Sequence, residues 1–206
     1  DVDGWILNSF AGRLFEVDRD AEAARTLYLP ERGAVYLWFS AAESAQPFPL
    51  PLEPFGRHTF ADGGKVEAWR IPRQIVAETR NVPSDKGITL IDAHFDGALR
   101  PGETAYLFLS FRVDALLPER VNWLLAPFAH VYDAEGRRIL IADGAVTPGW
   151  AWRLGDLQRK RLALSLPDSA QPPFRVEIGL YDGVHQLSAH FQRGEAWLPS
   201  LPIEPP

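Results

Sequence analysis

Apolar and polar residues alternate most regularly between Thr104 and Val113, where the positions between the apolar residues include Tyr106, Ser110 and Arg112. Successive side chains of a strand point to opposite faces, so this pattern predicts a strand with one face in a core. Similar segments follow after Pro83, separated by turn residues at intervals typical of an antiparallel sandwich. The other predicted strands cover residues 88–95, 120–132, 137–142, 159–166, 174–181 and 187–191.

Residues 120–132 differ from this pattern because they are apolar on both faces. Asp133-Ala-Glu-Gly136 follows them and predicts a turn into the strand at residues 137–142, so that the two strands form a hairpin. The last eight residues, 199–206, are rich in proline and are expected to form an extended end or linker.

The first 80 residues contain the one convincing helix signal of the chain. Asp18 or Asp20 can cap a helix that continues to Leu29, with apolar residues on one face, and Pro30 would end it. The turn at Gly33 then leads into residues 34–39.

Two strands are predicted after this helix. Residues 34–39 are apolar on both faces, which suits a central strand that is covered on both sides. Residues 45–57 contain four prolines and can form neither a helix nor an inner strand. Residues 66–71 form the second strand, which the turn at Asp62-Gly63-Gly64 introduces.

These patterns together predict a mainly β protein, α+β overall, with two parts. Residues 1–82 are expected to form a small α/β unit with a proline-rich wrapping loop. Residues 86–206 are expected to form an antiparallel β-sandwich, immunoglobulin-like or jelly-roll-like, with a proline-rich C-terminal end.

Charge and hydropathy exclude two classes of partner. The formal net charge of the 206 residues is -6, and Lys and Arg are scattered among Asp and Glu. No basic stripe can neutralise phosphates, so nucleic acid is not an expected partner. The apolar runs are far shorter than the roughly 20 residues of a membrane-spanning helix, so any membrane attachment must come from a segment absent from this chain.

The chain contains neither Met nor Cys. The absence of Met predicts that Asp1 follows a removed or omitted upstream segment, such as a signal peptide, a membrane region or another domain. The absence of Cys excludes disulfides, thiolate metal sites and cysteine nucleophiles, and it leaves the compartment open.

The histidines are natural candidates for catalysis or metal binding, and the best cluster is Asp92, His94 and Asp96. Alternate residues of a strand project from one side, so these three could chelate a cation or serve a hydrolase. A solvated polar face explains the pattern equally well. The chain also lacks a G-x-S-x-G elbow and a phosphate-binding fingerprint. We therefore expect no catalytic residues, no metal and no cofactor.

The remaining candidates are Trp150 and Trp152, which lie in a predicted loop, Gly149-Trp-Ala-Trp152. Loops of a sandwich commonly carry binding sites, and two indoles at alternate positions can offer faces on which a sugar ring stacks. The alternative is that one or both indoles plug the end of the sandwich or its junction with the first unit. If the chain binds a small ligand, we expect a saccharide held by Trp150 or Trp152.

An ordered series of turn and core motifs extends over residues 101–182. The motifs are Pro101-Gly-Glu103, Trp123 within a strand, His130-Val-Tyr-Asp-Ala-Glu-Gly-Arg137, Trp152-x-x-Gly155-Asp156 and Pro173-Phe-Arg-Val-Glu-Ile-Gly-Leu-Tyr-Asp182. This series resembles the C-terminal β-sandwich of bacterial membrane glycosyltransferases related to protein O-mannosyltransferases. The resemblance covers about residues 88–191. One departure is that Gly149-Trp-Ala stands where the family has Pro-Thr, and Asp156 replaces a glutamate.

The resemblance implies a non-catalytic, extracytoplasmic region of a membrane-bound glycosyltransferase, periplasmic or at the cell surface, that contacts a saccharide or a protein acceptor. The catalytic acidic residues of such transferases lie in the membrane-embedded part, which this chain lacks, so none is assigned here. The alternative is a stand-alone secreted or surface-anchored sandwich that binds carbohydrate or another protein.

Overall fold

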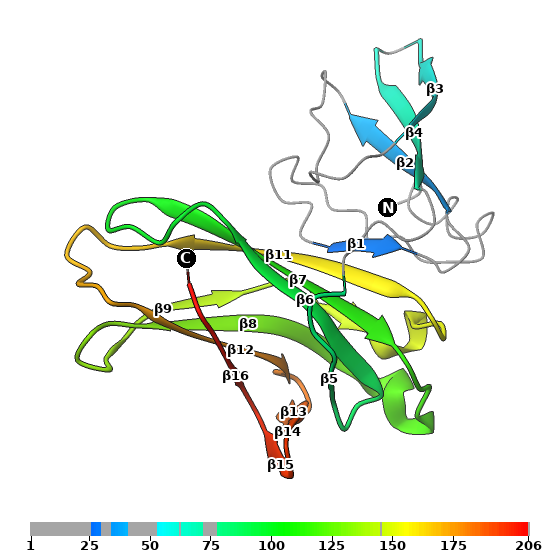
Figure 1. Cartoon of the computed structure of the whole chain (residues 1–206). Helices are drawn as coiled ribbons and strands as arrows, with labels where there is room; N and C mark the ends of the chain where they lie inside the picture. The colour runs from blue at the N-terminus through cyan, green and yellow to red at the C-terminus, as the bar shows by residue number, and fades with distance from the viewer. Residues whose placement is uncertain are drawn as a thin grey trace.

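The computed structural model describes residues 26–29, 34–40, 53–61, 63–71, 78–144 and 146–205. These residues lie mainly in antiparallel strands, and two of the sheets face each other as the layers of a sandwich (Figure 1). The predicted mainly β class, with an antiparallel sandwich, is therefore confirmed.

The first layer has the strand order β1-β11-β7-β6-β5, and all of its pairings are antiparallel. The alternation of apolar and polar residues predicted β7 with both ends at the observed residues. The strands are β1 (Thr26–Leu29), β5 (Val82–Pro83), β6 (Ile88–Asp96), β7 (Thr104–Val113) and β11 (Leu157–Ser165).

The second layer has the order β10-β8-β12-β13, with β9 paired to β8 and β16 paired to β12. The predicted hairpin is present, because β8 and β9 pair across the turn that begins at Asp133. The strands are β8 (Leu124–Tyr132), β9 (Arg138–Asp143), β10 (Thr147–Pro148), β12 (Arg175–Asp182), β13 (Leu187–Ser188) and β16 (Leu201–Ile203).

Shorter elements complete the described part of this region. Two 3₁₀ helices, η1 (Pro118–Asn122) and η2 (Gly149–Ala151), precede β8 and follow β10. A two-stranded ribbon consists of β14 (Phe191–Arg193) and β15 (Ala196–Leu198). Pro118 starts η1, so the residues before Leu124 are not part of the strand that was predicted from residue 120.

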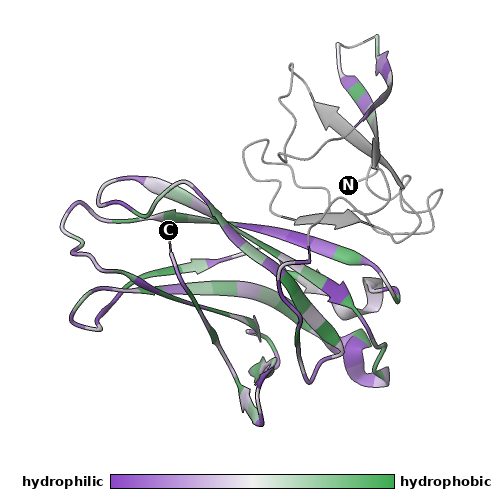
Figure 2. Cartoon of the chain, in the orientation of Figure 1, coloured by the Kyte–Doolittle hydropathy of each residue, from purple (hydrophilic) through white to green (hydrophobic). Residues whose placement is uncertain are grey.

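An apolar core fills the space between the two layers. Its side chains come from alternate positions, as on β7, where Leu107 and Leu109 are fully buried while Tyr106 is 37% exposed. Figure 2 shows hydrophobic and hydrophilic residues alternating along the strands. The faces that do not enter the core are the outer faces of the sandwich.

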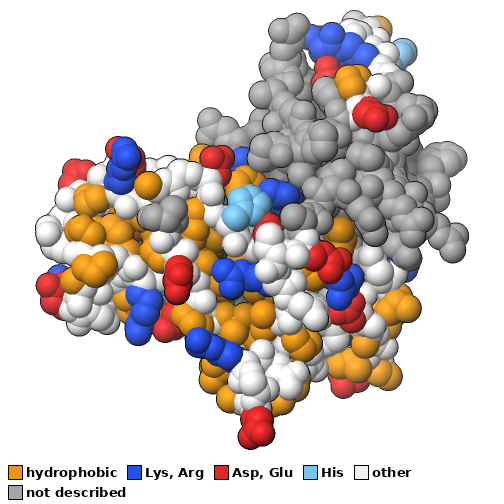
Figure 3. Space-filling view, in the orientation of Figure 1, with side chains coloured by type: hydrophobic (Ala, Val, Ile, Leu, Met, Phe, Trp, Pro, Cys, Tyr) orange, Lys and Arg blue, Asp and Glu red, His pale blue; other side chains and the backbone are white. Residues whose placement is uncertain are grey.

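The face drawn in Figure 3 shows Lys and Arg side chains interspersed with Asp and Glu. On that face the positive charges do not gather into one patch, which agrees with the charge distribution along the sequence.

The predicted helix ending at Leu29 is wrong over its last residues. Thr26–Leu29 is the strand β1, which pairs antiparallel with Leu157–Lys160 of β11. Thr and Tyr favour strands, and pairing with a sheet edge supplies backbone hydrogen bonds that outweigh a weak helical preference. The earlier part of that predicted helix and the turn at Gly33 lie outside the described residues.

The strand predicted at residues 34–39 is present as β2 (Ala34–Ser40), but its predicted central position is wrong. In the described part of the chain, β2 lies at the edge of a three-stranded sheet with the order β2-β4-β3. The centre is β4 (Lys65–Ile71), and the other edge is β3 (Glu53–Thr59), which contains Pro54. Apolar residues on both faces indicate burial but do not specify which neighbours a strand has.

The C-terminal end is extended, as expected, but it is not a linker. Leu201–Ile203 forms β16 and pairs with Val176–Ile178 of β12, and both Leu201 and Ile203 are buried. The single strand predicted at residues 187–191 is divided between β13 and β14.

Trp152 is part of the core at the end of the sandwich. Its side chain is 1% exposed and contacts Trp123 edge to face, with ring centroids 5.9 Å apart. Trp150, two residues earlier, is 42% exposed. Within the described residues, the buried indole Nε1 of Trp152 has no hydrogen-bond acceptor, so its ring is held by packing.

We expect Trp152→Ala to lower the free energy of unfolding by about 3–5 kcal/mol, because it leaves a large cavity beside Trp123. Trp150→Ala should change it by less than about 0.5 kcal/mol. Trp152→Phe keeps an aromatic ring and removes an unpaired N–H, so its effect should be smaller than that of Trp152→Ala. Urea unfolding followed by circular dichroism measures all three, and equal losses for Trp150→Ala and Trp152→Ala would contradict this assignment.

Candidate functional site

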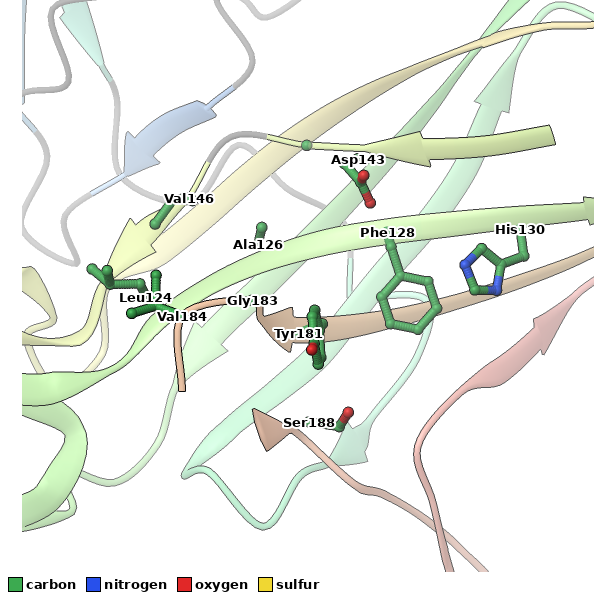
Figure 4. A pocket seen from close by; sticks show the side chains of 11 residues that line it. Leu124, Ala126, Phe128, His130, Asp143, Val146, Tyr181, Gly183, Val184 and Ser188 are labelled. Atoms are coloured by element: carbon green, nitrogen blue, oxygen red, sulfur yellow. The ribbon is translucent and has the colours of Figure 1, made fainter. Parts of the chain in front are cut away.

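A groove of about 660 Å³ lies on the outer face of the second layer. The groove runs along β8, where it is lined by Leu124, Ala126, Phe128 and His130, and Tyr181 of β12 lies beside them (Figure 4). These five residues are half-buried, so a ligand can reach them.

The orientation of these residues follows from the core on the opposite side of β8. Leu125, Pro127, Ala129 and Val131 are buried, and the residues between them face outward. Because β8 is apolar at both sets of positions, its outer face is unusually rich in apolar and aromatic side chains for a sheet surface. The predicted apolar character of both faces is therefore present in β8, residues 124–132, and its outer face lines the groove.

Gly179 gives Phe128 room to lie across β12. The two residues are register partners in adjacent strands. A Cβ atom at position 179 would lie 2.5 Å from Phe128 Cε1 and 2.7 Å from the carbonyl oxygen of Pro199. These approaches are too close for a side chain, so glycine is required for this placement of the ring.

Aromatic rings form a row along the outer face of β8. The rings of Phe128 and His130 are 4.7 Å apart between centroids, and those of His130 and Tyr132 are 6.4 Å apart. The guanidinium group of Arg175 stacks on Tyr132 at 4.6 Å. Tyr132 is the last ring of this row and does not belong to the groove lining.

The surroundings of His130 favour the neutral form of its imidazole. Burial lowers the pKa of His130, and the nearby charge of Arg138 lowers it further. Burial and the neighbouring carboxylate of Glu177 raise the pKa of Tyr132, so its hydroxyl stays protonated. Tyr132 donates that proton to Glu177 Oε2 at 3.4 Å.

Polar groups lie at the borders of the groove. Asp143, at the end of β9, and Ser188, in β13, both contribute to its lining (Figure 4). The hydroxyl of Tyr181 donates to Gln186 Oε1 at 2.8 Å, which fixes the ring at the end of β12. The described lining contains one carboxylate, that of Asp143, and neither Lys nor Arg.

Asp182 holds the two strands of the groove together at their ends. Its carboxylate accepts hydrogen bonds from the backbone N–H of Leu124 at 2.7 Å, of Val184 at 2.9 Å and of His185 at 3.0 Å. It also pairs with His185 Nδ1 at 2.8 Å. Burial alone would raise the pKa of Asp182, but these hydrogen bonds outweigh it and lower the pKa to about 2.

The two tryptophans predicted as ligand contacts do not form one platform. Trp152 is in the core and has no open face, whereas Trp150 is exposed in η2. Neither belongs to the lining of the groove. The binding of a saccharide by Trp150 remains a prediction.

Asp92 and His94 are engaged with each other on the outer face of the first layer. Arg159 can only donate, so His94 Nε2 accepts from it at 3.2 Å and Nδ1 carries the proton that is shared with Asp92 Oδ2 at 2.6 Å. Asp92 Oδ1 accepts from Thr79 Oγ1 at 2.7 Å. Asp96 is exposed at the end of β6.

This arrangement differs from a catalytic dyad, because the hydrogen-bond partner of His94 Nε2 is an arginine and not a nucleophile. Among the described residues, no group of three or more His, Cys, Asp or Glu side chains is arranged to hold a metal ion. His185 and His190 also pair with carboxylates, those of Asp182 and Asp85.

Sequence reasoning missed the groove because its residues come from separate segments. Phe128 and Tyr181 are 53 positions apart in the sequence, and they meet because β8 and β12 pair. The available signals were the apolar outer positions of β8 and the glycine in the middle of an otherwise regular strand, Gly179.

Comparison with known proteins identifies no relative, since no family model, curated protein or solved structure matches the chain. In the part of the chain that the structure describes, no helix is long and apolar enough to cross a membrane.

Replacing Asp182 by Asn should lower the free energy of unfolding by about 1–3 kcal/mol at neutral pH, because an amide has one acceptor oxygen and turns an N–H toward backbone donors. The folded-state pKa is depressed, so the ionised group stabilises the fold above the unfolded-state pKa of about 4. That stabilisation is lost as the pH falls from about 4 to about 2.

Urea unfolding of both proteins over a pH series tests this linkage. The difference between wild type and Asp182→Asn should be constant near neutral pH and should shrink below about pH 4. A difference that stays constant down to about pH 2 would show that the depressed pKa of Asp182 does not stabilise the fold.

Replacing Gly179 by Ala should lower the free energy of unfolding by about 1–3 kcal/mol, because the new methyl group would overlap Phe128 and the Pro199 carbonyl. The same substitution in a Phe128→Ala background should cost less, since only the carbonyl overlap remains. Denaturant unfolding of the four proteins measures this coupling. Equal costs in both backgrounds would mean that Gly179 does not determine the position of the Phe128 ring.

Proposed function

We propose that this chain is a non-catalytic β-sandwich that binds a saccharide in the groove along β8. The observation that carries the proposal is the combination of a row of half-buried rings with a few polar groups at its borders. Ligand sites are typically lined by apolar and aromatic side chains, with a small number of polar groups that fix orientation. A pyranose ring has a matching arrangement of groups, because its C–H faces are apolar and its hydroxyl groups lie around the rim.

The polar groups fit hydroxyl recognition better than acid-base chemistry. Asp143 can accept hydrogen bonds, and the hydroxyls of Ser188 and Tyr181 can both donate and accept. The imidazole of His130, with its lowered pKa, is a neutral partner. Among the described residues, the histidine–carboxylate pairs at Asp92 and Asp85 lie outside the groove, and the pair of His185 with Asp182 anchors its border without belonging to its lining.

The proposal extends to the parent protein. The motif series between residues 101 and 182 supports an extracytoplasmic region of a membrane-bound glycosyltransferase related to protein O-mannosyltransferases. In such a protein, the groove would hold a glycan or an acceptor outside the membrane, and catalysis would belong to another part of the polypeptide. A stand-alone secreted or surface-anchored sandwich is the alternative, and the groove fits that role as well.

The two alternatives predict different segments encoded upstream of Asp1. Several membrane-spanning segments encoded upstream of Asp1 would support the glycosyltransferase assignment. A cleavable signal peptide directly before Asp1 would support the stand-alone protein and would overturn that assignment.

Titration of the ¹⁵N-labelled protein with neutral gluco- and manno-oligosaccharides tests the binding site. A few ring contacts of about 0.5–1.5 kcal/mol each give affinities in the roughly millimolar range, so ligand must be added at high concentration. The backbone amides of β8 and β12 should shift. Phe128→Leu keeps apolar bulk but removes the ring face, and it should weaken binding by about tenfold.

Trp150→Ala is the matched control, because it removes an exposed indole outside the groove. It should leave the affinity unchanged. Loss of binding in Trp150→Ala, with shifts confined to residues 149–153, would move the site to the loop that the sequence singled out. The absence of any shift with all saccharides would overturn the proposal that the chain binds saccharide.

A further inference from the structure

We infer that the groove binds a linear, uncharged oligosaccharide that lies along β8, and neither a single sugar nor an acidic one. This inference rests on the proposed saccharide-binding function. It concerns the length and the charge of the ligand, which that function leaves open.

The shape of the site indicates a chain of sugars. From Leu124 to His130 the strand covers six residue steps, which correspond to roughly 20 Å at about 3.3 Å per residue. The outward side chains over this length follow a single line, and the aromatic row extends it to Tyr132. A single pyranose ring is much shorter than this line of apolar and aromatic side chains, so the groove matches several sugars joined end to end.

The two ends of the groove differ in character. At the Leu124 end, the side chains of Leu124, Val146 and Val184 gather from three segments (Figure 4). Val146 is 42% exposed and Val184 is 71% exposed, so they form an apolar rim that a ligand can reach. At the other end the row passes His130 and reaches Tyr132. The guanidinium group of Arg175 already stacks on Tyr132, so a linear ligand can lie between the valines and His130 and end before Tyr132.

The charges in the site select against acidic sugars. Asp143 is the one carboxylate in the described lining, which contains no Lys or Arg to pair with a uronate or a sulfate. His130 is held toward its neutral form, since burial lowers its pKa. Arg175 lies beyond the groove and is already paired with Glu177 at 3.6 Å. Arg138, whose charge acts on His130, is exposed and lies outside the lining.

Calorimetric titration with two series of saccharides tests the inference. One series contains neutral gluco- and manno-oligosaccharides of one, two, four and six sugars, and the other contains oligogalacturonates of the same lengths. Affinity should rise by at least about tenfold from one to four neutral sugars, because each added sugar makes a further contact in the groove. The oligogalacturonates should bind at least about tenfold more weakly, and Asp143→Asn should narrow that gap.

The comparison of four with six sugars measures the length of the site. Because the groove ends at His130, the six-sugar ligand should bind no more tightly than the four-sugar ligand, and Tyr132→Phe should change neither affinity. A monosaccharide that binds as tightly as the longer ligands would overturn this inference and leave the proposed function standing. Preference for the acidic series would also overturn it. If no saccharide of either series binds, the proposed function fails as well.

Discussion

The structure depends on one constraint, the burial of alternate residues of two antiparallel sheets in a single apolar core. Leu107, Leu109 and Val131 are fully excluded from solvent, and they fix which face of each strand points inward. Side chains of a strand alternate between two faces, so burying one set of residues in the core also determines which residues lie on the outer face. On β8 the displayed face is apolar and aromatic, and it lines the groove on the outside of the second layer.

Two residues of β12 convert that surface into a defined site. Gly179 lets the Phe128 ring lie across the neighbouring strand, and Asp182 ties the end of β12 to the start of β8 through Leu124. A carboxylate that accepts several backbone hydrogen bonds is both rigid and strongly ionised, which agrees with its low pKa. The same residue orders the turn to His185, so the border of the groove and the strand pairing have a common anchor.

The outer face of the first layer shows how a polar cluster on one strand is used for structure. Asp92 and His94 were correctly seen as neighbours on one side of β6, because period two requires it. Their partners, Thr79 and Arg159, come from distant segments, and their hydrogen bonds occupy both carboxylate oxygens of Asp92 and both ring nitrogens of His94. The cluster therefore joins β6 to β11 across β7, a role that no sequence spacing could have revealed.

The sequence by itself determined the longer strands of residues 86–206, namely β6, β7, β8, β9, β11 and β12, together with the hairpin after Asp133 and the apolar character of both faces of β8, since alternation and turn residues are local properties. The tertiary structure decided which strands pair, that Thr26–Leu29 is a strand, and that Leu201–Ile203 joins β12. It also separated Trp150 from Trp152, placing one in solvent and one against Trp123. These outcomes depend on contacts between residues far apart in the chain, whose energies exceed local preferences.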